Sequence, residues 1–187
     1  MNRGNLFILS GPAGAGKGTL RKRLSEASPS MAYSISCTTR KIRPGEVDGK
    51  DYNFISKNDF ETRITHDEFL EWAEVHGNYY GTRRSSVDKV LNEGCDVLLE
   101  IDVQGHAQVK SRMPEAISIF ITAPSLDDIE NRLRKRGTET RDQLDTRLRN
   151  AAMEMSHAGE YDHVVINDDL RRAENELVEL VKKYRDK

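Results

Sequence analysis

A glycine-rich segment that follows a short apolar run most strongly constrains how this chain folds. The apolar run covers residues 6–9, and the residues after Ser10 fit the pattern G-x-x-x-x-G-K: Gly11, Pro12, Ala13, Gly14, Ala15, Gly16 and Lys17. Residues 18–26 then place Leu20 and Leu24 four positions apart, as on one face of a helix. A strand, a glycine-rich loop and a helix in this order are typical of a phosphate-binding P-loop.

The chemistry of such a loop comes from its backbone and from one lysine. Glycines let successive backbone N–H groups converge on phosphate oxygens, and the following helix adds the positive end of its dipole. Lys17 supplies a positive charge to the β- and γ-phosphates. Gly18 stands where the motif usually has the Ser or Thr that binds magnesium, so Thr19 or solvent is expected there instead. An ordinary glycine-rich turn is the alternative, which the flanking strand and helix disfavour.

Short apolar runs alternate with longer amphipathic segments along the rest of the chain, which is typical of an α/β fold with a parallel sheet. Further strands are expected at residues 96–101, 117–121 and 163–166, each apolar on both faces. Residues 38–94 contain shorter, more polar strands and predict a small lobe inserted into the sheet. Residues 170–184 predict a final amphipathic helix.

Two capping patterns predict a pair of helices after residues 117–121. Ser125 with Asp128 resembles a capping box, and the helix that it begins is expected to end at Gly137. Thr140 with Gln143 repeats the device for a helix that runs to about residue 157. Residues 137–140 are therefore expected to form a tight hinge between two arginine-rich helices.

Charge and hydropathy exclude several classes of protein. The 187 residues suit one domain, and 29 Lys and Arg against 31 Asp and Glu exclude a bulk basic surface for nucleic acid. No apolar run approaches the roughly 20 residues that span a bilayer, and the first residues do not resemble a secretory signal. No membrane association and a cytoplasmic location are therefore expected. Cys37 and Cys95 lack metal-ligand or disulfide spacing, and both are expected to be reduced thiols.

Residues 38–54 combine two arginines with a tyrosine on an expected strand. Phosphoryl transfer between two anions is limited by charge repulsion, so an acceptor that is itself a phosphate needs cations of its own. Arg40 and Arg43 lie three positions apart, and Tyr52 follows a turn. Taken singly, these residues fit a solvated loop or a core position; together they favour an anion site.

The same stretch resembles the signature of the guanylate kinase family. The family's later motifs follow in order: Glu71-Trp72, Asn78-Tyr79-Tyr80-Gly81-Thr82, Glu100-Ile101-Asp102 with Gln104-Gly105, Arg136-Gly137-Thr138-Glu139 and Val165-Ile166-Asn167-Asp168. Residues 16–19 are similar to the P-loop variant of nucleoside monophosphate kinases. The resemblance implies one domain with a five-stranded parallel sheet flanked by helices as its core (residues 1–37, 95–124 and 158–187), a GMP-binding lobe (38–94) and a helical lid (125–157).

The resemblance also implies the activity, which is Mg²⁺-dependent transfer of the γ-phosphoryl group of ATP directly to GMP, with dGMP as a further acceptor. By resemblance, ATP contacts residues 11–19, Arg132, Arg136 and Asn167. Catalysis is implied for Lys17, Arg40, Arg132, Arg136 and Arg147, whose cations face the phosphates. GMP is expected to contact Ser36, Arg40, Arg43, Tyr52, Glu71, Tyr80, Thr82, Glu100 and Asp102. The sequence does not determine the oligomeric state.

Base selection follows from counting donors. Guanine presents two adjacent donors, N1–H and the 2-amino group, and one carboxylate accepts both, whereas adenine would meet that carboxylate with an acceptor at N1. Glu71 suits this role, Ser36 can donate to O6, and Thr82 is implied nearby. For Glu71 alone, a solvated charge at a strand edge is the alternative.

Two further carboxylates end an apolar strand. Glu100 and Asp102 are two positions apart and share one face of the strand. By resemblance, one lies near magnesium, to which Thr19 and Glu100 are assigned here, and the other reaches the guanine 2-amino group. The sequence does not decide which residue does which. An ion pair with Lys17 or with a lid arginine is the structural alternative.

Arginines flank the expected hinge between the two lid helices. Arg132, Arg136 and Arg147 match family positions that close over the ATP phosphates, which stabilises charge and expels water. Asn167 falls where the family contacts adenine, while Asp168 and Asp169 also suit an N-cap for the final helix. Two other functions stay open: a phosphopeptide-binding scaffold with this fold, and a kinase for another nucleoside monophosphate or a sugar phosphate. Lys17 with the loop glycines opposes the first, and Glu71 with Ser36 opposes the second.

Overall fold

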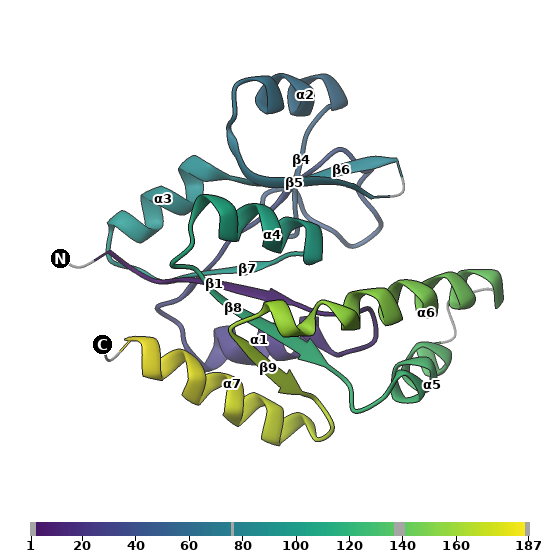
Figure 1. Cartoon of the computed structure of the whole chain (residues 1–187). Helices are drawn as coiled ribbons and strands as arrows, with labels where there is room; N and C mark the ends of the chain where they lie inside the picture. Colours follow the sequence, from purple (N-terminus) through teal and green to yellow (C-terminus); the bar gives the residue numbers. More distant parts are fainter. Residues whose placement is uncertain (1–2, 76, 137–140, 186–187) are drawn as a thin grey trace.

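The computed structural model of the chain describes residues 3–75, 77–136 and 141–185, with the side chain of Arg136 outside the described part. A five-stranded sheet forms its core, in the order β2-β7-β1-β8-β9, and all of its strand pairs are parallel (Figure 1). The α/β class with a parallel sheet is therefore confirmed. The strands are β1 (Leu6–Ser10), β2 (Ala32–Tyr33), β7 (Val97–Glu100), β8 (Ile117–Thr122) and β9 (His163–Ile166).

Helices cover both faces of this sheet because side chains alternate along its strands. Phe7 and Leu9 of β1 pack in one cluster with α1 (Lys17–Ala27) and α7 (Leu170–Arg185). Leu6 and Ile8 of the same strand pack in a second cluster with α3 (Arg84–Asn92) and α4 (Val103–Arg112). The apolar run at the start of the chain is thus buried on both faces, as a central parallel strand requires.

The prediction that every later strand is buried on both faces is wrong for β9. Val165 packs with α7, but Val164 and Ile166 are 41% and 44% exposed. The reason is position, because β9 is an edge strand, whereas α3 and α4 pack on β1 and β7 nearer the other edge.

A second sheet lies beyond α4 and has the order β4-β3-β6-β5 (Figure 1). Its elements are β3 (Cys37–Thr38), β4 (Asn53–Phe54), α2 (Lys57–Thr65), β5 (Phe69–Val75) and β6 (Asn78–Arg83). Phe60 of α2 stacks on Phe69 of β5 at 4.2 Å between ring centroids. The side chain of Gln108 on α4 bonds to both backbone polar groups of Trp72, accepting from its N–H at 3.1 Å and donating to its carbonyl at 2.7 Å. These two bonds hold β5 against α4.

Two helices extend from the end of β8 and lie beside the core (Figure 1). They are α5 (Leu126–Arg136) and α6 (Arg141–Ser156), followed by a short 3-10 helix, η1 (Ala158–Glu160). Ser125 accepts from the backbone N–H of Asp128 at 3.1 Å and donates to its carboxylate at 2.6 Å, which confirms the predicted cap. The predicted end at Gly137 and the Thr140 cap lie outside the described residues. In the part of the chain that is described, no helix combines the length and apolarity needed to cross a membrane.

Candidate active site

The glycine-rich loop connects β1 to α1 and has the backbone geometry that the sequence predicts. Gly11, Gly14 and Gly16 all have positive φ, at 141°, 89° and 94°. A side chain at Gly11 would overlap the carbonyl of Ile121, and one at Gly16 would overlap the amide of Asn167. Glycine is therefore required at both positions by conformation and by space. This loop, between a central parallel strand and a helix, defines the P-loop class of nucleotide-binding proteins.

Lys17 opens α1 and curls back over the loop. Its ammonium group donates to the carbonyls of Gly11 and Pro12, the latter at 3.2 Å. Thr19 is exposed on α1, and the space beside Gly18 is open. Gly18 lines the cleft described next but carries no side chain, and Thr19 is not among the residues that line it.

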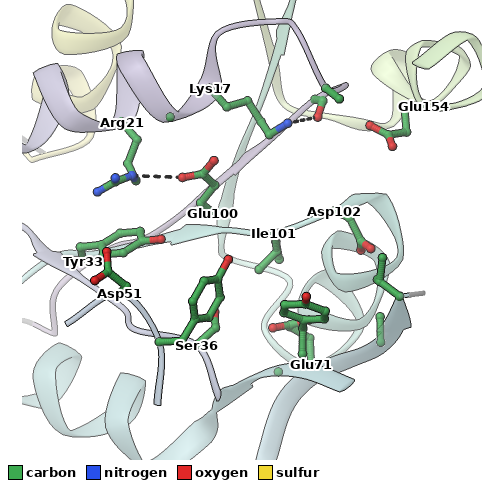
Figure 2. Close-up of a pocket in the computed structure, with 18 of the residues that line it drawn as sticks. Lys17, Arg21, Tyr33, Ser36, Asp51, Glu71, Glu100, Ile101, Asp102 and Glu154 are labelled. Atoms are coloured by element: carbon green, nitrogen blue, oxygen red, sulfur yellow. Dashed lines mark hydrogen bonds and ion pairs between the residues drawn. The ribbon is translucent and has the colours of Figure 1, made fainter. Parts of the chain in front are cut away.

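A cleft of about 960 Å³ joins the P-loop to the second sheet and to α6 (Figure 2). It brings together residues from segments far apart in the sequence. The predicted site residues that line it are Gly11, Ala13, Lys17, Gly18, Ser36, Tyr52, Glu71, Tyr80, Glu100, Asp102 and Arg147. The P-loop and the expected guanine-binding residues therefore face one common space.

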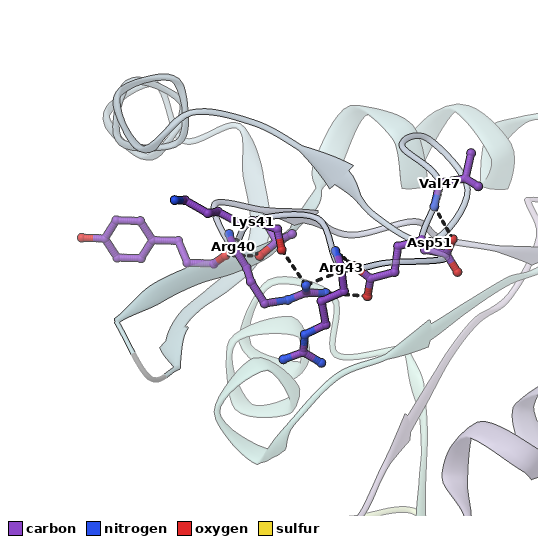
Figure 3. Close-up of polar contacts among 8 residues, drawn as sticks. Arg40, Lys41, Arg43, Val47 and Asp51 are labelled. Carbon is purple, nitrogen blue, oxygen red and sulfur yellow. Dashed lines mark hydrogen bonds and ion pairs between the residues drawn. The ribbon is translucent and has the colours of Figure 1, made fainter. Parts of the chain in front are cut away.

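Arg40 and Arg43 meet at a carboxylate that the sequence analysis did not single out. Arg40 donates to both oxygens of Glu46, at 3.0 and 2.8 Å, and the backbone N–H of Arg43 donates to the same group at 2.8 Å (Figure 3). These bonds lower the pKa of Glu46 and raise that of Arg40. The guanidinium also lies over the ring of Tyr52, at 5.4 Å, and Tyr52 contacts Tyr80 edge-on at 6.0 Å. Arg40, Tyr52 and Tyr80 thus lie together, and the Arg40 guanidinium and the Arg43 backbone already bind an anionic side chain. Tyr52 and Tyr80 line the cleft, whereas Arg40 and Arg43 are not among its lining residues.

Glu71 is buried at the other end of the cleft. It lies on β5 directly opposite Thr82 of β6, whose hydroxyl donates to it at 2.6 Å. Its second oxygen lies against Gly105 of α4, where a Cβ would come within 2.7 Å. Burial, with a smaller contribution from the charge of Asp102, raises the pKa of Glu71 to about 7. The alternative of a solvated strand-edge charge does not hold, because only 5% of Glu71 is exposed.

Glu100 and Asp102 both line the cleft but have different partners. Glu100 ends β7 and forms an ion pair with Arg21 of α1, 3.1 Å from Nε to the carboxylate. Asp102 caps α4 by accepting from the backbone N–H of Gly105 at 2.8 Å. The structure thus places Asp102 on the Glu71 side and Glu100 on the α1 side (Figure 2).

The remaining predicted residues lie behind the loop or on α6. Arg132 donates to the carbonyl of Asn167 at 2.6 Å and to that of Ala15 at 3.4 Å. The buried amide of Asn167 also donates to Ala15, at 2.8 Å. Arg147 reaches the cleft from α6, and the side chain of Arg136 lies outside the described residues. The cap of α7 is provided by Asp169, which accepts from the N–H of Arg172 at 2.9 Å.

Sequence reasoning missed four residues that shape the cleft: Arg21, Tyr33, Glu46 and Glu154. Arg21 follows Lys17 by one helical turn, and Glu154 follows Arg147 by two turns, so helical spacing was an available signal for both. Burial raises the pKa of Glu154, and the charge of Lys17 opposes that rise. Tyr33 carried no local signal, because only the pairing of β2 with β7 brings it to the cleft.

Comparison with known proteins identifies the family within the P-loop class. Residues 3–184 match the family described as guanylate kinase. The chain is 48% identical to a guanylate kinase of Desulfitobacterium hafniense, covering 94% of this chain and 88% of the relative. It is also 48% identical to a guanylate kinase of Shewanella violacea, covering 98% and 89%. A crystal structure of guanylate kinase from Anaplasma phagocytophilum matches with a TM-score of 0.81 at 32% identity, covering 100% of this chain and 88% of that one.

The chain belongs to the guanylate kinase family. It is an enzyme, an ATP:GMP phosphotransferase, and its substrates are the nucleotides ATP and GMP. The resemblance drawn from the motifs is confirmed, and the alternatives of a binding scaffold and of a kinase for another acceptor fall away.

Proposed function

We propose that the cleft performs direct in-line transfer of the γ-phosphoryl group from ATP to the phosphate of GMP, without a covalent intermediate. The observation that carries this proposal is that Lys17 of the P-loop and Glu71 of the second sheet line the same cleft. A donor phosphate and an acceptor base can therefore be held at once, which is the positioning that phosphoryl transfer requires. No general base is needed, because the acceptor phosphate has a second pKa of about 6 and is largely dianionic at neutral pH.

Arg40, Arg43, Tyr52 and Tyr80 are proposed to hold the GMP phosphate. Arginine forks match phosphate oxygens, and tyrosine hydroxyls donate without adding charge. The carboxylate of Glu46 already accepts from the Arg40 guanidinium and from the backbone N–H of Arg43, so these donors suit an oxyanion. Glu46 also orients the Arg40 guanidinium over Tyr52, which limits the entropy lost when a phosphate binds.

Glu71, Thr82, Ser36 and Asp102 are proposed to read the guanine base. The Thr82 hydroxyl occupies one oxygen of Glu71 and leaves lone pairs that can accept N1–H and the 2-amino group. Asp102 lines the same cleft on the side of Glu71, where its carboxylate can accept a hydrogen bond from the 2-amino group. Ser36 lines the cleft, where its hydroxyl can donate to O6.

Mg²⁺ is proposed as the metal that accompanies ATP. Magnesium takes few protein ligands and keeps several waters while it bridges phosphates, and it neutralises charge on the transferred group. Glu100 fits this role because its strand, β7, lies next to β1, from which the P-loop departs. Thr19 is exposed on α1 and fits less well. We therefore assign Glu100 to the metal side and Asp102 to guanine.

The α5–α6 segment is proposed as the lid, with Arg132, Arg136 and Arg147 closing on the ATP phosphates and Asn167 near adenine. Arg132 bonds to backbone carbonyls that carry only partial charge, so phosphates would be stronger partners. The division into a core (1–37, 95–124 and 158–187), a GMP-binding lobe (38–94) and a lid (125–157) belongs to the same proposal. The cytoplasmic location stays a prediction from the sequence.

A coupled assay of ADP release across GMP, dGMP, AMP, UMP and CMP tests the proposed base contacts. GMP and dGMP should be used well, because no group assigned above depends on the ribose 2′-hydroxyl. AMP should be used poorly, because its N1 is an acceptor and would face Glu71. Equal use of AMP and GMP would overturn the assignment of Glu71.

A further inference from the structure

Glu100 is held in the cleft by a residue outside the predicted site. Arg21 of α1 pairs with its carboxylate at 3.1 Å, and the Arg21 guanidinium lies over the ring of Tyr33 at 4.4 Å (Figure 2). All three side chains line the cleft. Tyr33 of β2 pairs in register with Leu98 of β7, two positions before Glu100, so Tyr33 and Glu100 share the sheet face that α1 covers.

The ion pair of Arg21 with Glu100 resembles a second ion pair of α1 but has a different location. Arg23 also lies on α1 and pairs with Glu174 of α7, joining the two helices on the face of the sheet. Exposure is similar: 30% and 24% for Arg21 and Glu100, against 37% and 27% for Arg23 and Glu174. Only the first pair lines the cleft, so Arg23 provides a matched control for the loss of a helix-surface ion pair.

We propose that Arg21 is a positioning residue for Glu100, and that Tyr33 fixes Arg21 in turn. A carboxylate at the end of a strand can rotate about its side-chain bonds, and a cation fixed on an aromatic face restricts that rotation. Lys17 lies one turn before Arg21 on the same helix, so the direction of Glu100 also determines how its charge acts on the P-loop cation. The inference rests on the proposed role of Glu100 and extends it to two residues that do not touch substrate.

A double-mutant cycle tests the proposal, with Arg21→Met, Glu100→Gln and the double variant. Each protein is measured for kcat and KM with GMP, and for binding of GMP and of ADP with and without Mg²⁺ by calorimetry. Removal of a group that orients a metal-binding side chain typically lowers metal affinity or activity by about 10–100-fold. We expect Arg21→Met to lose at least about tenfold in the same parameter that Glu100→Gln impairs, and the double variant to be no worse than Glu100→Gln.

Controls separate positioning from stability. Arg23→Met should keep the activity and ligand affinities of the parent, although it too loses an ion pair. Arg21→Lys should lose less than Arg21→Met because it keeps the charge. Tyr33→Phe should behave nearly like the parent because the aromatic face remains. If Arg21→Met does not fold, Arg21→Lys and Tyr33→Leu take its place in the cycle.

Several results would overturn the inference. They are independent losses from Arg21→Met and Glu100→Gln that add in the double variant, parent-like behaviour of Arg21→Met, or an equal loss in Arg23→Met. An impaired Arg21→Met beside an unimpaired Glu100→Gln would also overturn it, since Arg21 would then act without Glu100. The proposed function itself is judged separately, by whether the parent protein prefers GMP over AMP.

Discussion

The hydroxyl of Thr82 donates a 2.6 Å hydrogen bond to the carboxyl of Glu71, and the two residues face each other across β5 and β6. Both are buried, so the carboxyl group has exchanged water for hydrogen bonds from Thr82 and for the edge of Gly105. These hydrogen bonds do not offset the loss of hydration, and the pKa of Glu71 rises to about 7. The group proposed to read guanine therefore changes protonation near neutral pH.

The affinity for GMP should depend on this protonation. The ionised form accepts both guanine donors, whereas the protonated form turns one position into a donor, so kcat/KM for GMP should fall as the pH drops below about 7. The phosphate of GMP also titrates, at a pKa of about 6. Glu71→Gln separates the two effects. Its pH profile should keep the fall in kcat/KM near pH 6 that the GMP phosphate causes, and it should lose the fall near pH 7. A pH profile of identical shape in both proteins would contradict the assignment.

Replacement of Glu71 by Gln should damage guanine selectivity more than phosphate binding. The amide presents an NH₂ group to a guanine donor and leaves a buried polar group unpaired, at a cost of about 1–3 kcal/mol. GMP should lose on the order of tenfold or more in kcat/KM, while AMP loses nothing. The quantity to measure is the ratio of GMP to AMP efficiency in each protein. An unchanged ratio would show that base choice comes from Ser36 or Asp102.

The folding stability of the protein should also depend on pH because of Glu71. Its pKa is raised in the folded state, so it contributes stability at low pH that is lost as the pH rises from about 4.5 through about 7. The stability of the parent relative to Glu71→Gln should therefore decrease by about 1–3 kcal/mol between pH 5 and pH 8. Denaturant unfolding of both proteins at the two pH values measures this. The comparison cancels titration elsewhere, and a constant difference would refute the raised pKa.

Lys17→Met should abolish most transfer while the fold persists. Lys17 is the first residue of α1 and belongs to neither apolar cluster of the core sheet, so its replacement removes charge from the phosphates without opening a cavity. The expected loss in kcat is at least about 10²–10³-fold, as for one preorganised transition-state donor. Circular dichroism and thermal unfolding provide the control for folding. Near-normal turnover in a folded variant would remove the P-loop assignment.

GMP and a non-hydrolysable ATP analogue together should make the protein more compact. The phosphates of ATP offer Arg132 of α5 stronger partners than its present backbone carbonyls, and the phosphate of GMP offers Arg40 a second anion beside Glu46. Small-angle scattering with and without both ligands measures the radius of gyration, with occupancy confirmed by calorimetry. Full occupancy with no change in that radius would count against closure of the lid.

The sequence by itself predicted those features that depend only on residues close together in the chain. The P-loop follows from glycines between an apolar run and a helix, and Gly11 and Gly16 do have the backbone that this reading requires. The cap formed by Ser125 and Asp128 is equally local. Alternation of apolar runs and amphipathic segments predicted the parallel sheet, because strands buried on both faces have few polar positions.

Tertiary structure alone decided which side chains meet and which faces stay in water. β9 has the same apolar composition as a buried strand, yet its position at the sheet edge leaves Val164 and Ile166 exposed. Taken alone, Glu71 also fitted a solvated charge at a strand edge, and only its packing against α4 decided that it is buried. Arg21 and Glu100 are 79 positions apart, and only the pairing of β7 with its neighbours beneath α1 makes them partners. The sequence encodes these contacts, but they depend on the packing of distant segments and therefore leave no local pattern.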